Sequence, residues 1–156
     1  MNDPSPIRIR RARRDDVADI VAMLADDALG RPRERIVDPL PQSYFAAFDA
    51  LADDPRIWLM VAEDDGGQVV GCLQLCVLPG LSSQGASRGL IEDVRVASRC
   101  RSRGIGEQLV GWAIAEARDR GCKVVELLTH HSRVDAQRFY VRLGFAASHV
   151  GMTLRF

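Results

Sequence analysis

The sequence predicts an α/β (α+β) fold, in which a mixed, mostly antiparallel sheet of six to seven strands carries helices on both faces. Short apolar runs predict the strands, and longer segments with apolar residues at helical spacing predict the helices. These elements follow one another in the order β-α-α-β-β-β-α-β-α-β, which is typical of a sheet covered by helices. The length of 156 residues fits one domain, so we expect a single domain over residues 1–156.

The first third of the chain predicts one strand and two helices. Residues 7–12 alternate apolar and basic side chains, which is typical of a strand with one buried face. The acidic pair at 15–16 can cap a helix, and the apolar residues of 17–24 fall on one face of that helix. Residues 31–41 are charged and contain prolines, so we expect a loop there, followed by a short helix over 44–51.

The middle of the chain predicts three strands joined by turns. Residues 57–62 form a continuous apolar run, which is typical of a buried strand. Two aspartates and two glycines at 64–67 predict a hairpin turn that leads into a returning strand over 69–78. Residues 79–87 are rich in glycine and serine and predict a loop, and residues 90–96 predict the next strand.

The last third predicts two helices, each followed by a strand. Residues 104–120 carry a strong amphipathic pattern that Gly121 ends, and residues 124–128 predict the strand that follows. Because a helix connects them, the strands over 90–96 and 124–128 should run parallel. A helix over 134–143 and a final strand over 145–156 complete the predicted order.

Composition excludes several functional classes from our expectations. Lysine plus arginine and aspartate plus glutamate number 21 each, which indicates neither a nucleic-acid nor a membrane partner. The four cysteines lack CxxC spacing and have no histidine cluster beside them, so we expect no metal site. The polar start does not resemble a leader, and no apolar run reaches the roughly 20 residues of a membrane span. We therefore expect a cytoplasmic protein.

A glycine-containing turn between a predicted strand and a predicted helix is the strongest candidate for a ligand site. The turn consists of Arg101, Ser102, Arg103, Gly104, Ile105 and Gly106. The first N–H groups of a helix lack internal partners, and glycines let an anion approach the backbone closely. The two arginines add charge and donors. The turn is not a Walker loop or a dinucleotide fingerprint, and the alternative is a solvated loop.

Three motifs, in this order, resemble the GCN5-related N-acetyltransferase (GNAT) family. They are I-E-D-V-R-V at 91–96, R-S-R-G-I-G at 101–106 and D-A-Q-R-F-Y-V-R-L-G-F at 135–145. Each motif alone is weak, whereas all three at these separations are specific. The segment S-R-V-D-A-Q-R-F-Y at 132–140 most resembles the small-amine branch of the family, which includes aminoalkylphosphonate acetyltransferases. The resemblance spans nearly the whole chain in element order and implies the GNAT fold.

The resemblance implies that acetyl-CoA is the co-substrate and that no metal takes part. Backbone groups of the strand at 94–96 would bind the pantetheine arm as an added strand would. The turn at 101–106 would hold the pyrophosphate. Many family members carry an asparagine where this chain has Arg133. The residues implied in cofactor binding are Val94, Arg95, Val96, Arg101, Ser102, Arg103, Gly104, Ile105, Gly106, Arg133, Ala136, Phe139 and Tyr140.

Acetyl transfer to an amine requires a base, because an alkylammonium has a pKa near 10. Glu92 is the first candidate and Asp93 the second, and as strand neighbours they face opposite sides. Either carboxylate could instead pair with an arginine. Tyr140 can donate a proton to the leaving thiolate, although it could also be a core aromatic beside Phe139. Cys100 could carry an acyl group, but the family pattern favours direct transfer.

We therefore expect an enzyme that transfers acetyl directly from acetyl-CoA to a primary amine of a small molecule in a ternary complex. The alternatives are a protein acetyltransferase, acting on a lysine or an N-terminus, and a non-catalytic acyl-CoA sensor. Arg31, Arg33 and Arg35 could recognise an acidic group on the acceptor, although a solvated loop explains them as well. Dimers are common in the family and the final strand could pair with a second copy, so we also expect a homodimer.

Overall fold

The computed structural model describes residues 6–156 and contains five strands and five helices. The strands are β1 (Ile7–Arg11), β2 (Ile57–Asp64), β3 (Val69–Leu78), β4 (Arg88–Val96) and β5 (Val124–Leu127). The helices are α1 (Val17–Ala25), α2 (Gln42–Asp53), α3 (Ser82–Gly85), α4 (Ile105–Asp119) and α5 (Val134–Arg142). Two 3-10 turns precede α1 and α4, at Arg14–Asp16 and Ser98–Cys100.

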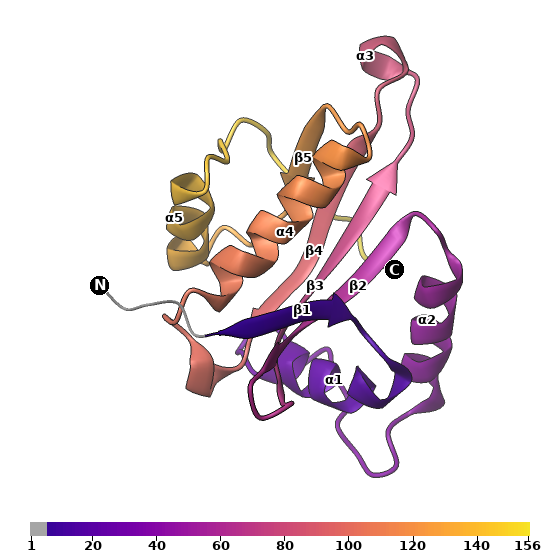
Figure 1. The fold of residues 1–156 in the computed structure, drawn as a ribbon, viewed down its shortest axis with the longest axis vertical. Helices are drawn as coiled ribbons and strands as arrows, with labels where there is room; N and C mark the ends of the chain where they lie inside the picture. Colours follow the sequence, from indigo (N-terminus) through magenta and orange to yellow (C-terminus); the bar gives the residue numbers. More distant parts are fainter. Residues whose placement is uncertain (1–5) are drawn as a thin grey trace.

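The five strands form one sheet in the order β1-β2-β3-β4-β5 (Figure 1). Neighbours from β1 to β4 are antiparallel, whereas β4 and β5 are parallel and joined through α4. A mixed, mostly antiparallel sheet is therefore confirmed. α4 crosses in front of the sheet in Figure 1, and α1 packs on the opposite face.

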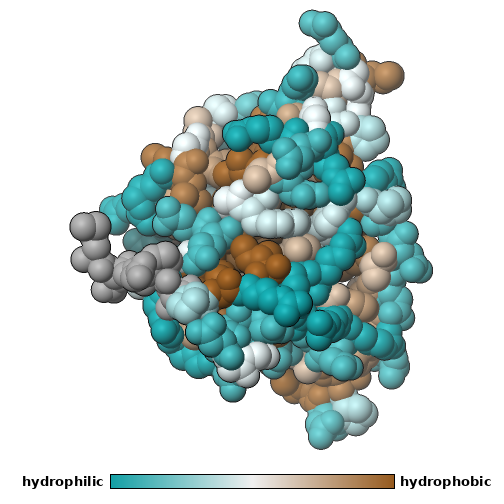
Figure 2. Space-filling model, in the orientation of Figure 1, coloured by the Kyte–Doolittle hydropathy of each residue, from teal (hydrophilic) through white to brown (hydrophobic). Residues whose placement is uncertain are grey.

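Two clusters of buried side chains hold the helices to the two faces of the sheet. Leu73, Leu75 and Ile91 pack with Leu109 and Val110 of α4. On the other face Ile20 and Met23 of α1 pack with Val61, Cys72 and Ala97. Each fully buried large aliphatic side chain contributes about 1.5–3 kcal/mol to the stability of the fold. These two layers therefore fix the positions of β3 and β4. The face shown in Figure 2 is otherwise mostly hydrophilic, with small separate apolar patches.

Of two local predictions, the hairpin turn is confirmed and the side-chain cap of α1 is wrong. The hairpin turn forms, because Asp64 Oδ1 accepts hydrogen bonds from the N–H groups of Gly66 and Gln68 at 3.0 and 2.9 Å. Asp16 directly precedes α1, but its side chain makes no capping hydrogen bond to that helix. It instead binds the guanidinium of Arg10 at 2.7 and 3.0 Å, so its role is to tie β1 to the start of α1.

The predicted final strand is wrong. Residues 145–156 form no strand, so the sheet has five strands rather than six to seven. Four apolar side chains of this segment alternate along it and are highly exposed: Val150, Met152, Leu154 and Phe156. Alternation alone predicts a strand, but a strand also needs a neighbour that accepts and donates its backbone hydrogen bonds, and this segment has none within residues 6–156.

Over the same residues, no helix combines the length and the apolarity needed to cross a bilayer.

Candidate functional site

The centre of the candidate site is an open edge on the second half of β4. β4 and β5 pair only where Arg88–Ile91 of β4 meets Val124–Leu127 of β5. β4 then continues to Val96, beyond the end of β5 at Leu127. Residues 92–96 therefore have β3 on one side and no strand of the described chain on the other. This edge can accept an extended ligand by the hydrogen bonding that joins two strands.

The backbone groups of Val94 and Val96 point to this open edge. The N–H of Ala97 donates to the Val70 carbonyl of β3 at 2.9 Å, and successive residues of a strand point to opposite sides. The carbonyl of Val94 accepts from Arg95 Nη1 at 2.9 Å, and the carbonyl of Val96 accepts from Arg101 Nε at 3.4 Å. Arginine side chains therefore lie where the predicted pantetheine arm would bind.

A β-bulge decides which side chains of β4 share a face. Cys72 and Gln74 of β3 lie opposite Arg95 and Glu92, so β4 has one residue more than β3 between these pairs. Asp93 adopts a φ of 50° in this bulge. Because Cys72 and Gln74 are two residues apart, they point to one face of the sheet. Glu92 and Arg95, which lie opposite them, therefore share that face.

The predicted anion-binding turn forms at the start of α4. Ser102 and Gly104 have φ values of 62° and 77°, and this winding precedes the first N–H groups of the helix. A Cβ on Gly106 would lie 3.4 Å from Phe139 Cζ and 3.6 Å from Val96 Cγ2. These are ordinary contact distances, so the start of α4 lies against both the open edge and α5, and the structure brings these three predicted elements together.

The two arginines of the turn behave differently from each other. Arg101 reaches away from the helix start, and its Nη2 lies 3.1 Å from the Asp26 carbonyl and 3.4 Å from the Asp26 carboxylate. Both partners of this ion pair are about half exposed, so it stabilises the fold only weakly. Arg103 is exposed at the turn, whereas the guanidinium of Arg101 is held by Val96 and Asp26.

Glu92 has the properties expected of a base. Gln74 Nε2 donates to Glu92 Oε2 at 3.1 Å, which orients the carboxylate. Partial burial raises the pKa of Glu92, and the negative charge of Asp93 raises it further. The backbone of Asp93 lies in the left-handed region, and its carbonyl accepts a hydrogen bond from Cys72 Sγ at 3.5 Å. A neighbouring side chain therefore orients the carboxylate of Glu92, whereas Asp93 occupies the bulge position of β4.

Tyr140 lies on α5 among aromatic rings and in the field of two arginines. Its ring contacts those of Phe139 and Phe145, with centroids 5.0 and 5.8 Å apart. Burial raises the pKa of Tyr140, and the charges of Arg95 and Arg133 oppose this increase. The phenol therefore stays protonated at neutral pH and can donate a hydrogen bond.

Arg133 directly precedes α5 and binds a residue that sequence reasoning missed. Its Nη2 donates to Asp27 Oδ1 at 2.8 Å, across 106 positions of the chain. Asp27 follows α1, and nothing in the local pattern around it marks a functional residue. Ala136 is half-buried one turn before Tyr140. Cys100 is buried in the core cluster that packs under α4.

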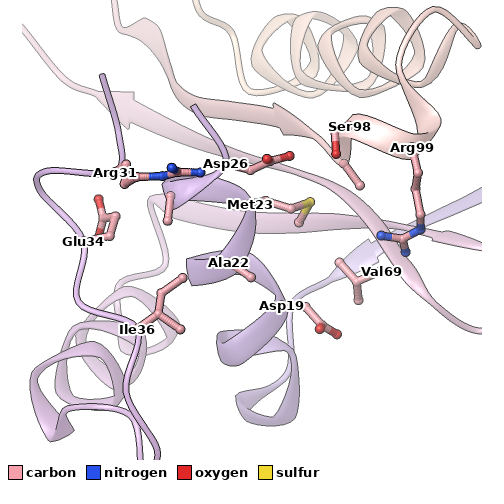
Figure 3. Close-up of a pocket in the computed structure, with 12 residues that line it drawn as sticks. Asp19, Ala22, Met23, Asp26, Arg31, Glu34, Ile36, Val69, Ser98 and Arg99 are labelled. Atoms are coloured by element: carbon pink, nitrogen blue, oxygen red, sulfur yellow. The ribbon is translucent and has the colours of Figure 1, made fainter. Parts of the chain in front are cut away.

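A cavity of about 490 Å³ lies beside this site rather than within it. In Figure 3, Asp26 and Arg31 lie on one side of this cavity and Ser98 and Arg99 lie on the other. Its lining comes from α1, the following loop and the segment before the anion-binding turn. Glu92 and Tyr140 do not line it. The cavity is therefore separate from the part of β4 that carries Glu92.

Comparison with known sequences identifies related enzymes. A family model described as "Acetyltransferase (GNAT) family" matches residues 21–145. The aminoalkylphosphonate N-acetyltransferase of Salmonella typhimurium is 36% identical over 112 residues, which cover 72% of this chain and 71% of that protein.

Solved structures show the same architecture. A protein from Bacillus halodurans C-125, described as a transcriptional regulator, superposes with a TM-score of 0.94 and is 48% identical, covering 97% of this chain and all of that one. A putative acetyltransferase from Agrobacterium tumefaciens superposes with a TM-score of 0.84 and is 25% identical, covering 96% of this chain and all of that one.

Proposed function

The chain belongs to the acetyltransferase (GNAT) family, and we propose that its acceptor is the primary amine of a small molecule. It is an acetyl-CoA-dependent N-acetyltransferase. The open edge of β4 carries the proposal, because Glu92 lies where this edge begins and the anion-binding turn follows where it ends. The similarity to an enzyme named for aminoalkylphosphonates supports a small acceptor.

We assign acetyl-CoA binding to three parts of the open edge and its surroundings. Backbone groups of Val94 and Val96 bind the pantetheine arm, which displaces the guanidinium groups of Arg95 and Arg101 from their carbonyls. The N–H groups of residues 101–106 bind the pyrophosphate. The start of α5 covers the other side of the arm, through Arg133, Ala136 and Phe139.

The reaction proceeds in a ternary complex. Glu92 takes a proton from the acceptor ammonium, and the neutral nitrogen attacks the thioester carbonyl carbon. The C–S bond breaks as the tetrahedral intermediate collapses, and the electron pair of this bond stays on sulfur. As the C–S bond breaks, the nitrogen loses its second proton to solvent, and Tyr140 gives its proton to the sulfur and is then reprotonated from solvent. Coenzyme A therefore leaves as the thiol. The products are the acetamide and coenzyme A, and no electrons are gained or lost.

Thiol release tests this function directly. Incubating the full chain with acetyl-CoA and a panel of small primary amines should release coenzyme A only in wells that contain an acceptor. A lysine peptide that reacts faster than every small amine would favour a protein acetyltransferase. Binding of acetyl-CoA without turnover on any amine would favour a sensor, in line with the description of the B. halodurans protein.

We also propose that the enzyme is a cytoplasmic homodimer in which residues 149–156 of two copies pack together. Three observations support the dimer: the alternating exposed side chains of this segment, the unpaired edge of β5, and a formal net charge of zero that causes no net repulsion. All four cysteines carry free thiols, which supports a reducing compartment.

Light scattering on the full chain tests the dimer. Wild type should have twice the mass of one chain at micromolar concentration, whereas Met152→Asp with Leu154→Asp should have the mass of one chain, because charges would replace the apolar contact. Leu81→Asp is the matched control, since Leu81 is 98% exposed far from the C-terminus in sequence, and it should stay dimeric. A wild type that remains monomeric at 100 µM, or a double variant that remains dimeric, contradicts this assignment.

A further inference from the structure

Two arginines from different elements converge on one carboxylate beside the open edge of β4. Arg133 binds Asp27 Oδ1 at 2.8 Å, and Arg95 Nε lies 3.8 Å from Asp27 Oδ2. All three side chains are largely buried, with exposed fractions of 29% for Arg133, 18% for Arg95 and 22% for Asp27. Two positive charges face one negative charge, so the cluster carries a net positive charge in a partly desolvated place.

The cluster is incompletely hydrogen bonded. Asp27 Oδ1 accepts from Arg133 and from the N–H groups of Leu29 and Gly30, at 2.7 and 2.9 Å for the latter two. By contrast, Arg95 Nε and Asp27 Oδ2 are buried and neither has a hydrogen-bond partner among the described residues. Their separation of 3.8 Å is too long for a hydrogen bond. An unpaired buried donor is costly, which marks Arg95 as ready to bind a further acceptor.

The cluster lies close to the reacting groups. Arg95 shares a face of the sheet with Glu92. It follows Glu92 by three positions on the bulged strand, so their backbones lie roughly 7–10 Å apart. The charges of Arg95 and Arg133 both act on the phenol of Tyr140. A short acceptor can therefore place its nitrogen at Glu92 while another of its groups reaches the two arginines.

We propose that Arg95 and Arg133 bind an anionic group of the acceptor, so that the enzyme prefers short alkylamines that carry a phosphonate, phosphate or carboxylate. This inference rests on the proposed function, since it concerns the acceptor of the same site. The anion supplies the acceptor that Arg95 Nε lacks, and a guanidinium pair suits the several oxygens of such a group. Asp27 holds Arg133 in place, and its carboxylate is the anion beside the two arginines until the acceptor binds. Arg31, Arg33 and Arg35 are exposed, so they suit this role less well.

Two amines of equal length test the preference. Thiol release is measured with 2-aminoethylphosphonate and with 2-aminoethanol, and acetyl-CoA affinity is measured separately by calorimetry. Arg133→Ala and Arg95→Gln should each lower kcat/KM for the phosphonate by roughly 10- to 100-fold. Because both residues also lie in the proposed acetyl-CoA site, the readout is the ratio of kcat/KM for the phosphonate to kcat/KM for 2-aminoethanol, which should fall by roughly 10-fold in each variant. Arg138→Ala is the matched control on α5, where Arg138 is 72% exposed, and it should resemble wild type.

The outcomes separate this inference from the proposed function. Turnover of both amines with no preference for the phosphonate overturns the inference and leaves the acetyltransferase intact, whereas no turnover of any amine overturns the proposed function. Equal losses of kcat/KM on both amines would assign the arginines to the cofactor alone and overturn the inference. Asp27→Asn gives a test that does not remove an arginine: it should lower KM for the phosphonate, because the competing negative charge is gone, and a raised or unchanged KM contradicts the inference.

Discussion

Replacing Glu92 by glutamine should lower kcat by roughly 10²–10⁴-fold, because the amide cannot take the proton that the acceptor ammonium must lose. The substitution keeps the size of the side chain and one oxygen that can accept the hydrogen bond from Gln74. The acetyl-CoA site should therefore be undisturbed. Steady-state thiol release with saturating acceptor measures kcat, and calorimetry should give a Kd for acetyl-CoA close to that of wild type.

The pH dependence gives a second test of Glu92 as the base. A base works only when deprotonated, so kcat falls as pH drops through the pKa of Glu92. Partial burial and Asp93 raise this pKa above the ordinary value of 4.5. The acid limb of the kcat–pH profile should therefore lie above pH 4.5. This limb should be absent from the residual activity of Glu92→Gln.

Asp93→Asn is the matched control for Glu92→Gln. Asparagine tolerates the left-handed backbone that Asp93 adopts, so the bulge should persist. It also removes one negative charge, which lowers the pKa of Glu92 and should shift the acid limb to lower pH. A loss of kcat in Asp93→Asn that matches or exceeds the loss in Glu92→Gln would transfer the role of base to Asp93.

The glycine-containing turn at 101–106 and the order of the elements as far as α5 were predictable from local patterns. The glycines, the arginines and the amphipathic repeat of α4 all lie within 20 consecutive residues. Interactions between residues close in sequence therefore determine the turn and the helix. The choice between Glu92 and Asp93 was not predictable in the same way. Strict alternation puts Glu92 and Arg95 on opposite faces, and only the bulge, visible in the pairing of β3 with β4, brings them to one face.

Long-range pairing accounts for the other errors of sequence reasoning. Asp27 meets Arg133 across 106 positions, and no single pattern in one sequence joins residues so far apart. The alternation of residues 150–156 wrongly predicted a strand, because a strand also depends on a neighbour that the described chain does not supply. Residue 133 is an arginine in this chain, where asparagine is common in the family. In the structure this arginine binds Asp27.

Replacing Tyr140 by phenylalanine should lower kcat by roughly 10- to 100-fold while leaving the Kd of acetyl-CoA within about threefold of wild type. The phenyl ring keeps the contacts with Phe139 and Phe145, so α5 should pack as before. Only the hydroxyl is lost, and with it the hydrogen bond to the leaving sulfur. The effect should therefore appear in the chemical step, which single-turnover measurements of thiol release isolate from product release.

The only other tyrosine provides the control for this substitution. Tyr44 donates a hydrogen bond to Glu34 and accepts one from the N–H of Arg35, and it lies on α2 away from the open edge of β4. Tyr44→Phe should keep the single-turnover rate of wild type. Because burial raises the pKa of Tyr140, its hydroxyl stays protonated over the working range, so the loss in Tyr140→Phe should be the same at pH 7 and pH 9. An unchanged single-turnover rate in Tyr140→Phe would remove Tyr140 from the reaction and leave water to protonate the thiolate.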